Sequence, residues 1–318
     1  MNLLVTGGAG FIGSNLIDRL LKDGHTVVCI DNFDDYYNPS IKEQNISGAL
    51  LNDRFVIVRG DIRDVSALEK CFSNISIDVV IHLAARAGVR PSLVNPELYY
   101  DVNVIGTLRL LEAMKKWNVT RLVFGSSSSV YGNNNHVPFS ETDSVDRPVS
   151  PYAASKKAGE LLCYTYHELY KFDLYCLRFF TVYGPRQRPE MAIHHFVKKI
   201  LAGDRITLFG DGSSQRDYTF IDDILDGVTK CLNNLKGYEI INLGESQTIS
   251  LVDLITVIEN LTGKKARIDW KPMQPGDVTR TFADITKARK ILGYNPQYHV
   301  ADGIKIFIEW YQKNGLIK

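Results

Sequence analysis

The sequence contains few cysteines, and no two of them have the spacing of a zinc site or a redox motif. Five occur among 318 residues, an odd number scattered along the chain: Cys29, Cys71, Cys163, Cys176 and Cys231. Disulfide frameworks of secreted proteins use even numbers of cysteines, and zinc sites use closely spaced pairs. We therefore expect a reducing compartment. The sequence also predicts no metal site, because His136 has no partner in sequence and the adjacent His194 and His195 point to different faces of a helix.

Long apolar runs and an excess of charge are missing as well. No run approaches the ~20 residues needed to span a bilayer, so we expect no membrane segment. The 37 basic side chains are balanced by 36 acidic ones, whereas a nucleic-acid-binding protein would show a basic excess or stripe. Met1 leads almost directly into the apolar run Leu3–Thr6, which leaves no room for a signal peptide and predicts a cytoplasmic protein.

Short apolar runs alternate with helical patterns in the first half of the chain. The expected strands are Leu3–Thr6, Thr26–Ile30, Phe55–Val58, Val79–His82, Leu122–Phe124 and Leu174–Phe179. The expected helices include Phe11–Leu21, Val104–Lys116 and Tyr152–Tyr170. This alternation predicts parallel strands with helices on both faces, which is the doubly wound α/β sheet of a Rossmann domain.

The character of the sequence changes after about Thr181, where glycines, prolines and short mixed elements dominate. Residues 1–181 are predicted to form the Rossmann domain, and residues 182–318 a smaller mixed α/β lobe for the substrate. A segment at about 220–245 is expected to return to the sheet. The two lobes should share a cleft at the carboxyl ends of the parallel strands, where such sheets bind ligands.

A glycine-rich turn, TGGAGFIG at Thr6–Gly13, joins the first strand to the first helix. Gly7 permits a tight turn, Gly10 lets the backbone approach a pyrophosphate, and Gly13 allows the helix to pack closely on the sheet. The start of the helix then presents its partial positive charge to the phosphates. The pattern predicts a dinucleotide site; the alternative is a structural turn without a ligand.

Two aspartates end neighbouring strands beside this turn. Asp31 ends the second strand, where a carboxylate accepts the ribose hydroxyls of an adenosine and repels a 2′-phosphate, which favours NAD over NADP. The alternative is an aspartate that only caps a turn. Asp61 follows the third strand and is a candidate either for the adenine amino group or for a loop turn. The segment 34–37, Asp-Asp-Tyr-Tyr, is interpreted as a surface loop near the adenosine.

A tyrosine and a lysine four residues apart, Tyr152 and Lys156 in YAASK, open a long predicted helix. This spacing places both side chains on one helix face. A free tyrosine has a pKa near ~10, too high for a general base at neutral pH. An adjacent ammonium group and a positive nicotinamide ring both lower that pKa. The pair predicts hydride transfer, although alone it would be an ordinary surface pair.

The strand before this helix continues into four serines, in LVFGSSSSVYG. Ser127, Ser128 and Ser129 are predicted at the mouth of the cleft, where one hydroxyl shares the substrate proton with Tyr152. The alternative is a polar strand end whose serines cap the next turn.

These motifs, together with Asp31–Asn32, Gly60–Asp61 and HLAA at His82–Ala85, resemble the extended short-chain dehydrogenase/reductase superfamily, and within it the nucleotide-sugar epimerases. The resemblance runs nearly end to end, through GPRQRP (184–189), GDGSSQRDYTFIDD (210–223), NLG (242–244) and QPGDV (274–278). It implies a UDP-sugar substrate. It also implies a homodimer formed by two helices of each subunit, at about 95–116 and 151–170.

The resemblance implies 4-epimerisation. Tyr152 as phenolate takes the proton of the sugar 4-hydroxyl with help from Ser127, while Lys156 holds the nicotinamide ribose. The C4 hydride passes to NAD and returns to the other face of the 4-keto sugar. Asn103 is implied to orient cofactor or substrate. The implied cofactor set is Gly7, Gly10, Phe11, Ile12, Gly13, Asp31, Asn32, Asp61, Ile62, Leu83, Ala84, Ala85, Asn103, Ser126, Tyr152, Lys156 and Phe179.

The implied substrate set draws on both lobes. Arg216 and Arg280 are expected near the diphosphate, Phe196 and the segment 206–209 around uracil, and Asp277 at the ribose. By themselves, a lone phenylalanine is usually core and a lone arginine usually solvated. The full set is Arg90, Ser127, Ser128, Ser129, Tyr152, Thr181, Arg188, Met191, Ala192, Phe196, Thr207, Phe209, Arg216, Asp277 and Arg280.

Serines stand where related reactions need acids. Sugar 4,6-dehydratases of this superfamily carry Thr-Asp-Glu at the place of Ser127–Ser129, and UDP-glucuronate decarboxylases carry a glutamate at the place of Ser129. Serine supplies neither an acid nor a base at pH 7. The three serines therefore favour epimerisation, which needs one reversible transfer of a proton and a hydride.

The segments ARAGVRPS (85–92) and RPEMAIHHF (188–196) resemble UDP-glucuronic acid 4-epimerases. A carboxylate held by charge-assisted hydrogen bonds, out of line with the 4-keto group, would not be lost as carbon dioxide. Candidates to hold it are Ser128, Ser129, Thr181 and Arg188, with Arg90 and Arg186 in addition. The alternatives are a 4-epimerase of UDP-glucose/UDP-galactose or UDP-N-acetylglucosamine, whose arginines hold only the diphosphate, and an NAD-binding sensor without catalysis.

Overall fold

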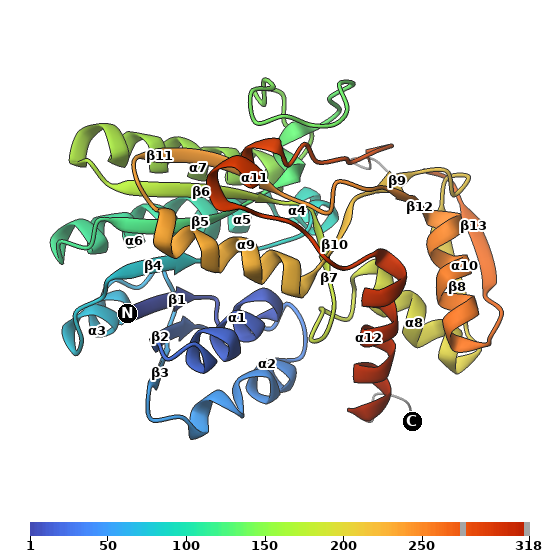
Figure 1. Cartoon of the computed structure of the whole chain (residues 1–318), viewed down its shortest axis with the longest axis horizontal. Helices are drawn as coiled ribbons and strands as arrows, with labels where there is room; N and C mark the ends of the chain where they lie inside the picture. Colours follow the sequence, from blue (N-terminus) through green and yellow to red (C-terminus); the bar gives the residue numbers. More distant parts are fainter. Residues whose placement is uncertain (274–277, 315–318) are drawn as a thin grey trace.

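A parallel sheet forms the centre of the molecule (Figure 1). In residues 1–273 and 278–314, which the computed structural model describes, all neighbouring strands of this sheet are parallel. The order of its seven strands in this part of the chain is β11 (Tyr238–Leu243), β6 (Asp173–Phe179), β5 (Arg121–Ser127), β4 (Val79–His82), β1 (Asn2–Thr6), β2 (Thr26–Asp31) and β3 (Phe55–Arg59). This arrangement confirms the predicted doubly wound α/β fold.

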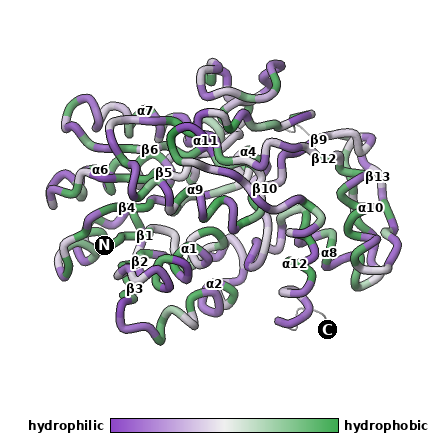
Figure 2. The backbone as a smooth tube through the Cα atoms, in the orientation of Figure 1, coloured by the Kyte–Doolittle hydropathy of each residue, from purple (hydrophilic) through white to green (hydrophobic). Residues whose placement is uncertain are grey.

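Helices cover both faces of the sheet. One face is covered by α1 (Phe11–Lys22), α9 (Ile221–Asn234) and α11 (Thr286–Leu292), and the other by α3 (Val65–Ser73), α6 (Gly106–Lys116) and α7 (Pro151–Tyr170). Successive side chains of β1 point to opposite faces of the sheet. Leu3 and Val5 belong to the hydrophobic core beneath α1, α9 and α11, and Leu4 belongs to the core beneath α3, α6 and α7. Strands buried on both faces read as continuous apolar runs, which is why these runs stood out in the sequence. Figure 2 shows hydrophobic residues gathered in these central strands.

Short elements lie in the connections between the strands and the helices of the sheet. They are α2 (Pro39–Ile46), η1 (Ala49–Leu51), α4 (Val89–Val94), α5 (Pro96–Tyr100), the π-helix η2 (Asp101–Ile105) and η3 (Ser128–Tyr131). The helix expected at Val104–Lys116 is therefore α-helical only from Gly106, because a π-helical turn precedes it. Among the helices of the described residues, none has the length and apolar composition to cross a membrane.

The chain after β6 builds a second set of elements beside the sheet (Figure 1). Their strands pair in twos, β7 with β10 and β8 with β13 in parallel and β9 with β12 antiparallel. The segment containing α9 and β11 lies against the main sheet, where β11 pairs with β6. The boundary at residue 181 stays a prediction. The elements are β7 (Thr181–Tyr183), α8 (Ala192–Ala202), β8 (Arg205–Phe209), β9 (Gln215–Arg216), β10 (Tyr218–Phe220), β12 (Ile249–Ser250), α10 (Leu251–Thr262), β13 (Arg267–Lys271) and α12 (Val300–Lys313).

Candidate active site

Two adjoining cavities lie at the carboxyl ends of the parallel strands. The larger, of about 520 Å³, extends from the glycine turn to Ser129, and the smaller, of about 190 Å³, shares Val89, Ser128, Ser129 and Thr181 with it. The sequence placed a ligand cleft at this edge. Every residue of the predicted cofactor set except Asn103 lines the larger cavity. Seven predicted substrate residues also line it, namely Ser127, Ser128, Ser129, Tyr152, Thr181, Arg188 and Met191, and Arg216 lines the smaller one.

The glycine turn leaves no room for side chains. Gly7 has a φ of +70°, and a Cβ atom on Gly13 would lie 2.3 Å from the Gly7 carbonyl oxygen. Gly10 is the N-cap of α1, and its N–H donates to Gly7 O at 3.2 Å. A backbone surface of this kind at a helix N-terminus fits the pyrophosphate of a dinucleotide, because N–H groups and the helix dipole both favour an anion.

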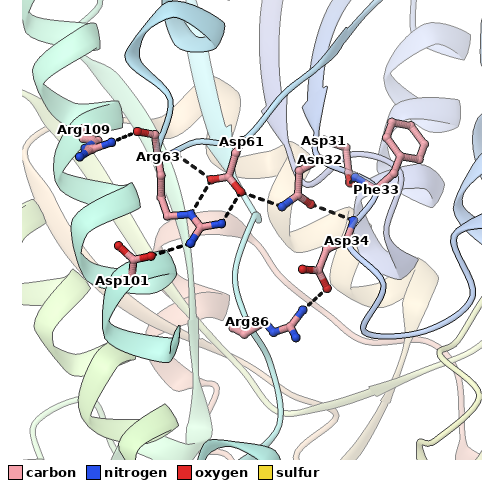
Figure 3. Close-up of polar contacts among 9 residues, drawn as sticks. All are labelled: Asp31, Asn32, Phe33, Asp34, Asp61, Arg63, Arg86, Asp101 and Arg109. Carbon is pink, nitrogen blue, oxygen red and sulfur yellow. Dashed lines mark hydrogen bonds and ion pairs between the residues drawn. The ribbon is translucent and has the colours of Figure 1, made fainter. Parts of the chain in front are cut away.

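Polar contacts fix the residues at the ends of β2 and β3 (Figure 3). Asp31 accepts hydrogen bonds from Ala9 N at 3.0 Å and Phe33 N at 2.8 Å, so its carboxylate ties the glycine turn to β2. Asp61 accepts two from the Arg63 guanidinium, at 2.9 and 2.8 Å, and one from Asn32 Nδ2 at 2.8 Å. The hydrogen bonds from Arg63, followed by that from Asn32, lower the pKa of Asp61 to about 2 against the effect of burial.

The loop after β2 forms part of the cavity wall. It was interpreted as a surface loop near the adenosine, and Asp34, Tyr36 and Tyr37 line the larger cavity. Arg86 forms an ion pair with Asp34 (Figure 3) and lies over the Tyr36 ring, 5.0 Å from its centroid. Lys42, which the sequence analysis missed, also lines the cavity, and its Nζ donates to Asp34 O at 2.8 Å. The position of this loop directly after Asp31 was the available signal.

Helix α7 carries the tyrosine and lysine into the cavity. Pro151 occupies its first turn, and Ser150 caps it by accepting from Ala153 N. Lys156 Nζ donates to Gly125 O on β5 at 2.7 Å, and burial lowers the pKa of Lys156 to about 8. Tyr152 faces the same cavity one turn earlier.

The environment of the Tyr152 phenol differs in part from the expectation. Burial raises its pKa, and the groups that lower it are a hydrogen bond with Ser127 and the charge of Arg188. The sequence predicted that Lys156 would lower this pKa, but its ammonium is directed at the backbone of β5 instead. Ser127 Oγ also donates to Ser129 Oγ and accepts from Ser129 N, both at 3.1 Å. The start of η3 therefore holds the Ser127 hydroxyl.

Asn103 lies in the π-helix and binds to protein groups on two sides. Its Oδ1 accepts from Arg86 N at 2.7 Å, and its Nδ2 donates to Arg86 O at 3.0 Å and to Ser155 Oγ at 2.9 Å. It thereby joins the loop after β4, which lines the cavity, to α7. The role predicted for it, to orient cofactor or substrate, stays a prediction.

The remaining predicted substrate residues that the structure describes do not line either cavity. Arg90 lies over Phe209, 4.6 Å from the ring centroid, and so connects α4 with β8. Phe196 is part of the hydrophobic core, with 6% of its surface exposed. Their predicted roles stay predictions, as do those of Ala192, Thr207 and Arg280. Asp277 lies outside the described residues.

The fold, the glycine turn and the Tyr152–Lys156–Ser127 group together define an extended short-chain dehydrogenase/reductase. Within that class the chain belongs to the GDP-mannose 4,6-dehydratase family, whose model matches residues 4–307. It is 46% identical over 312 residues to a UDP-glucuronate 4-epimerase of Thermodesulfobacterium geofontis, covering 98% of this chain and 96% of that protein. The family assignment confirms the resemblance seen in the sequence.

Solved structures agree with this assignment. The UDP-glucuronic acid 4-epimerase of Bacillus cereus, in complex with UDP-glucuronic acid and NAD, superimposes with a TM-score of 0.92 at 40% identity over 99% of this chain and 100% of that one. The UDP-glucose 4-epimerase of Thermotoga maritima, solved with UDP-glucose, gives a TM-score of 0.91 at 33% identity over 99% of each chain.

Proposed function

We propose that this protein is an NAD-dependent 4-epimerase that converts UDP-glucuronate to UDP-galacturonate. One observation carries the proposal: Tyr152, Lys156 and the serines at the end of β5 line the same cavity as the glycine turn. A relative that is 46% identical over nearly its whole length is a UDP-glucuronate 4-epimerase. These findings support an isomerase over a sensor, which would not need a general base.

The residues fit a bound NAD at both ends of the cavity. The glycine turn would hold the pyrophosphate, Asp31 the adenosine ribose and Lys156 the nicotinamide ribose. When bound, NAD accepts a hydride from C4 of the sugar, returns it to the opposite face, and adds a positive charge that favours the tyrosine phenolate.

Tyr152 and Ser127 handle the proton at the sugar 4-oxygen. Tyr152 Oη accepts it as C4 is oxidised, and Ser127 Oγ donates a hydrogen bond to the same oxygen. The 4-keto sugar then turns within the cavity, and the proton returns from Tyr152 Oη to O4 as C4 is reduced. Among the protein groups, Ser127 through its hydrogen bond and Arg188 through its charge favour the anionic phenol.

The serines separate epimerisation from dehydration, although the family takes its name from a dehydratase. Of the described residues that line the cavities, the carboxylates are Asp31 at the end of β2 and Asp34 and Asp61 in the loops after β2 and β3. Ser127–Ser129 supply no acid or base at neutral pH. A reaction that needs only one reversible proton transfer therefore fits this site.

The carboxylate of the sugar is the reason to prefer UDP-glucuronate. Arg188 and Thr181 both line the larger cavity. Arg188 also forms an ion pair with Glu190 at 3.0 Å, and its charge lowers the pKa of the Tyr152 phenol. A cation near the reacting centre suits an acidic sugar and has no partner on a neutral one. The second candidate is a 4-epimerase of UDP-glucose or UDP-N-acetylglucosamine; the Thermotoga maritima protein, 33% identical to this chain, is a UDP-glucose 4-epimerase.

The direct test supplies UDP-glucuronate, UDP-glucose and UDP-N-acetylglucosamine separately and follows inversion at C4 by NMR. We expect fast conversion of the acid and slow conversion of the neutral sugars. Fast conversion of a neutral sugar with none of the acid would replace the first candidate by the second. No conversion of any sugar, with NAD still bound, would favour a sensor.

We also propose a homodimer formed by the two helical segments 95–116 and 151–170. Leu161 and Tyr164 on α7 are 55% and 47% exposed, and Tyr100 and Ile105 are exposed on the neighbouring segment. Exposed apolar side chains on adjacent helices suit an isologous interface. Light scattering of the native chain and of Leu161→Lys tests it, with a dimer expected for the first and a monomer for the second. The cytoplasmic location stays a prediction.

A further inference from the structure

A row of buried polar side chains crosses the sheet directly behind the serines. Ser126 on β5 is in register with Arg178 on β6, which is in register with Asn242 on β11. All three are buried, and Ser126 immediately precedes Ser127. Buried polar groups are costly unless they have partners, so the partners of this row decide what it does.

Glu160 on α7 joins this row to the helix of Tyr152. Its Oε1 accepts hydrogen bonds from Ser126 Oγ at 2.7 Å and Arg178 Nε at 2.9 Å, and its Oε2 accepts one from Arg178 Nη2 at 2.9 Å. The Glu160 and Arg178 side chains are 0% and 1% exposed. Tyr152, Lys156 and Glu160 recur at intervals of four residues, which places them on one helix face.

The same guanidinium group reaches the turn that carries the other serines. Arg178 Cζ lies 4.8 Å from the centroid of the Tyr131 ring, and Tyr131 is the last residue of η3, which begins at Ser128. Tyr131 Oη donates to Asn242 Oδ1 at 2.7 Å. The Glu160–Arg178 pair therefore contacts the chain on both sides of Ser127.

We propose that Glu160 and Arg178 form a positioning pair for the active site, an inference that rests on the proposed function and deepens it. The pair holds the strand end at Ser127 in place against the helix of Tyr152. Its carboxylate also favours the charged form of the neighbouring Lys156.

Stability alone does not call for this pair. Two apolar residues of the same volume often stabilise a core as well as a buried ion pair, or better. Burial opposes the charge of Glu160, yet hydrogen bonds from Arg178 and Ser126 hold the pKa of this carboxyl below its usual range. An ionised carboxylate on the catalytic helix is thus kept inside the core, where Arg178 at 2.9 Å and Lys157 at 3.4 Å form ion pairs with it.

The negative charge of Glu160 raises the pKa of Lys156. Burial lowers its pKa, while Cys163 and Glu160 on its own helix raise it. From β4 it faces His82, which burial and the Lys156 charge keep neutral by lowering its pKa to about 3. Phe124 on β5 presents its ring 5.2 Å from Lys156 Nζ. Glu160 is therefore the ionised carboxylate among the described groups that act on Lys156.

Two variants test the proposal. Glu160→Gln keeps the shape and an acceptor for Ser126 but removes the charge. The double variant Glu160→Leu with Arg178→Met replaces the pair by apolar side chains and keeps the proposal testable where the single variant fails to fold. For both we expect kcat to fall about tenfold or more with KM nearly unchanged, because a small misplacement of reacting groups mainly affects turnover. The alkaline limb of the kcat profile should move to lower pH.

The titration of Lys156 gives a readout that does not depend on turnover. Carbon-13 NMR of protein labelled at lysine Cε, with the resonance assigned by Lys156→Met, should show Lys156 deprotonating at lower pH in both variants. A folded double variant with unchanged kcat and an unchanged Lys156 titration would overturn the proposal. So would a rise in KM alone, which indicates a loosened cavity.

The matched control is Glu239→Leu with Lys287→Met. This pair also joins a strand of the sheet to a helix, with its ion pair at 2.7 Å, but both side chains are a third exposed and neither lines the two described cavities. We expect wild-type kcat and an unchanged Lys156 titration. If the wild type converts no UDP-sugar while the titration still shifts in the Glu160 variants, the proposed function fails and the positioning pair stands.

Discussion

The ammonium group of Lys156 donates a 2.7 Å hydrogen bond to the carbonyl oxygen of Gly125, from a side chain that is 5% exposed. This hydrogen bond joins helix α7 to β5, the strand that ends at Ser127. It also removes a cation from water, and the resulting pKa of about 8 lies well below the ordinary 10.5. The residue that serves catalysis therefore opposes folding at neutral pH.

Replacing Lys156 by methionine should stabilise the nucleotide-free chain at pH 7. The folded chain binds the lysine proton more weakly than the unfolded chain does, so Lys156 lowers the free energy of unfolding below pH 8. This penalty is lost as the pH rises from about 8 toward 10.5. We expect a gain on the order of 2 kcal/mol at pH 7 that shrinks by pH 10, measured by urea unfolding. A gain independent of pH would point to packing instead.

Tyr152→Phe should abolish turnover and leave NAD bound. Loss of a general base reduces rates by roughly a thousandfold, whereas the remaining ring still lines the cavity. Inversion at C4 is followed by NMR, and the nucleotide released on denaturation is measured by absorbance. The control Tyr298→Phe removes a hydroxyl from a residue that lines neither cavity and should turn over normally. Substantial activity in Tyr152→Phe would assign the proton transfer to another group.

Site residues in short motifs could be predicted from the sequence, whereas site residues in loops could not. The glycine turn and the Tyr152–Lys156 pair were predicted because their function depends on spacing within one or two adjoining elements. Tyr36 was predicted only as part of a surface loop near the adenosine, and Lys42 was missed, since the positions of both depend on how this loop folds over the cavity. The assignment of Phe196 came from resemblance, and its burial in the core is a matter of packing that sequence spacing does not encode.

The contact of Glu160 with Arg178 could not be predicted from the sequence either. The sequence places it on the face of α7 that carries Tyr152, but the residue that neutralises it, Arg178, lies on β6. Their contact depends on the strand register of Ser126 with Arg178, and register is set by the assembled sheet. Only the structure reveals that one carboxylate joins α7, β5 and β6.

Gly13→Ala should unfold the glycine turn or prevent NAD binding. Its Cβ would lie 2.3 Å from Gly7 O and 2.7 Å from Gly8 Cα, and backbone atoms cannot move aside as a flexible side chain can. Isothermal titration with NAD and thermal unfolding measure the effect. Gly48→Ala is the matched control, because its Cβ meets no atom within 4 Å. A Gly13 variant that binds NAD normally would contradict the close approach.

Arg188→Gln should lower kcat/KM for UDP-glucuronate by roughly 10- to 100-fold, because a charge-assisted hydrogen bond contributes about 1.5–3 kcal/mol. The effect on UDP-glucose should be much smaller. A carboxylate released from this restraint should also be lost in part, so carbon dioxide release is measured beside C4 inversion. Arg267→Gln, an exposed arginine on β13, serves as control. An equal loss for both sugars would place Arg188 at the diphosphate.

The Asp31 carboxylate proposed to hold the adenosine ribose also accepts hydrogen bonds from the N–H groups of Ala9 and Phe33. An evolutionary route toward a 2′-phosphorylated cofactor would have to remove this charge. Removing it also leaves two backbone donors unpaired, at about 1–3 kcal/mol each when buried. A lineage that starts from this chain is therefore expected to acquire a stabilising substitution elsewhere before its cofactor preference drifts.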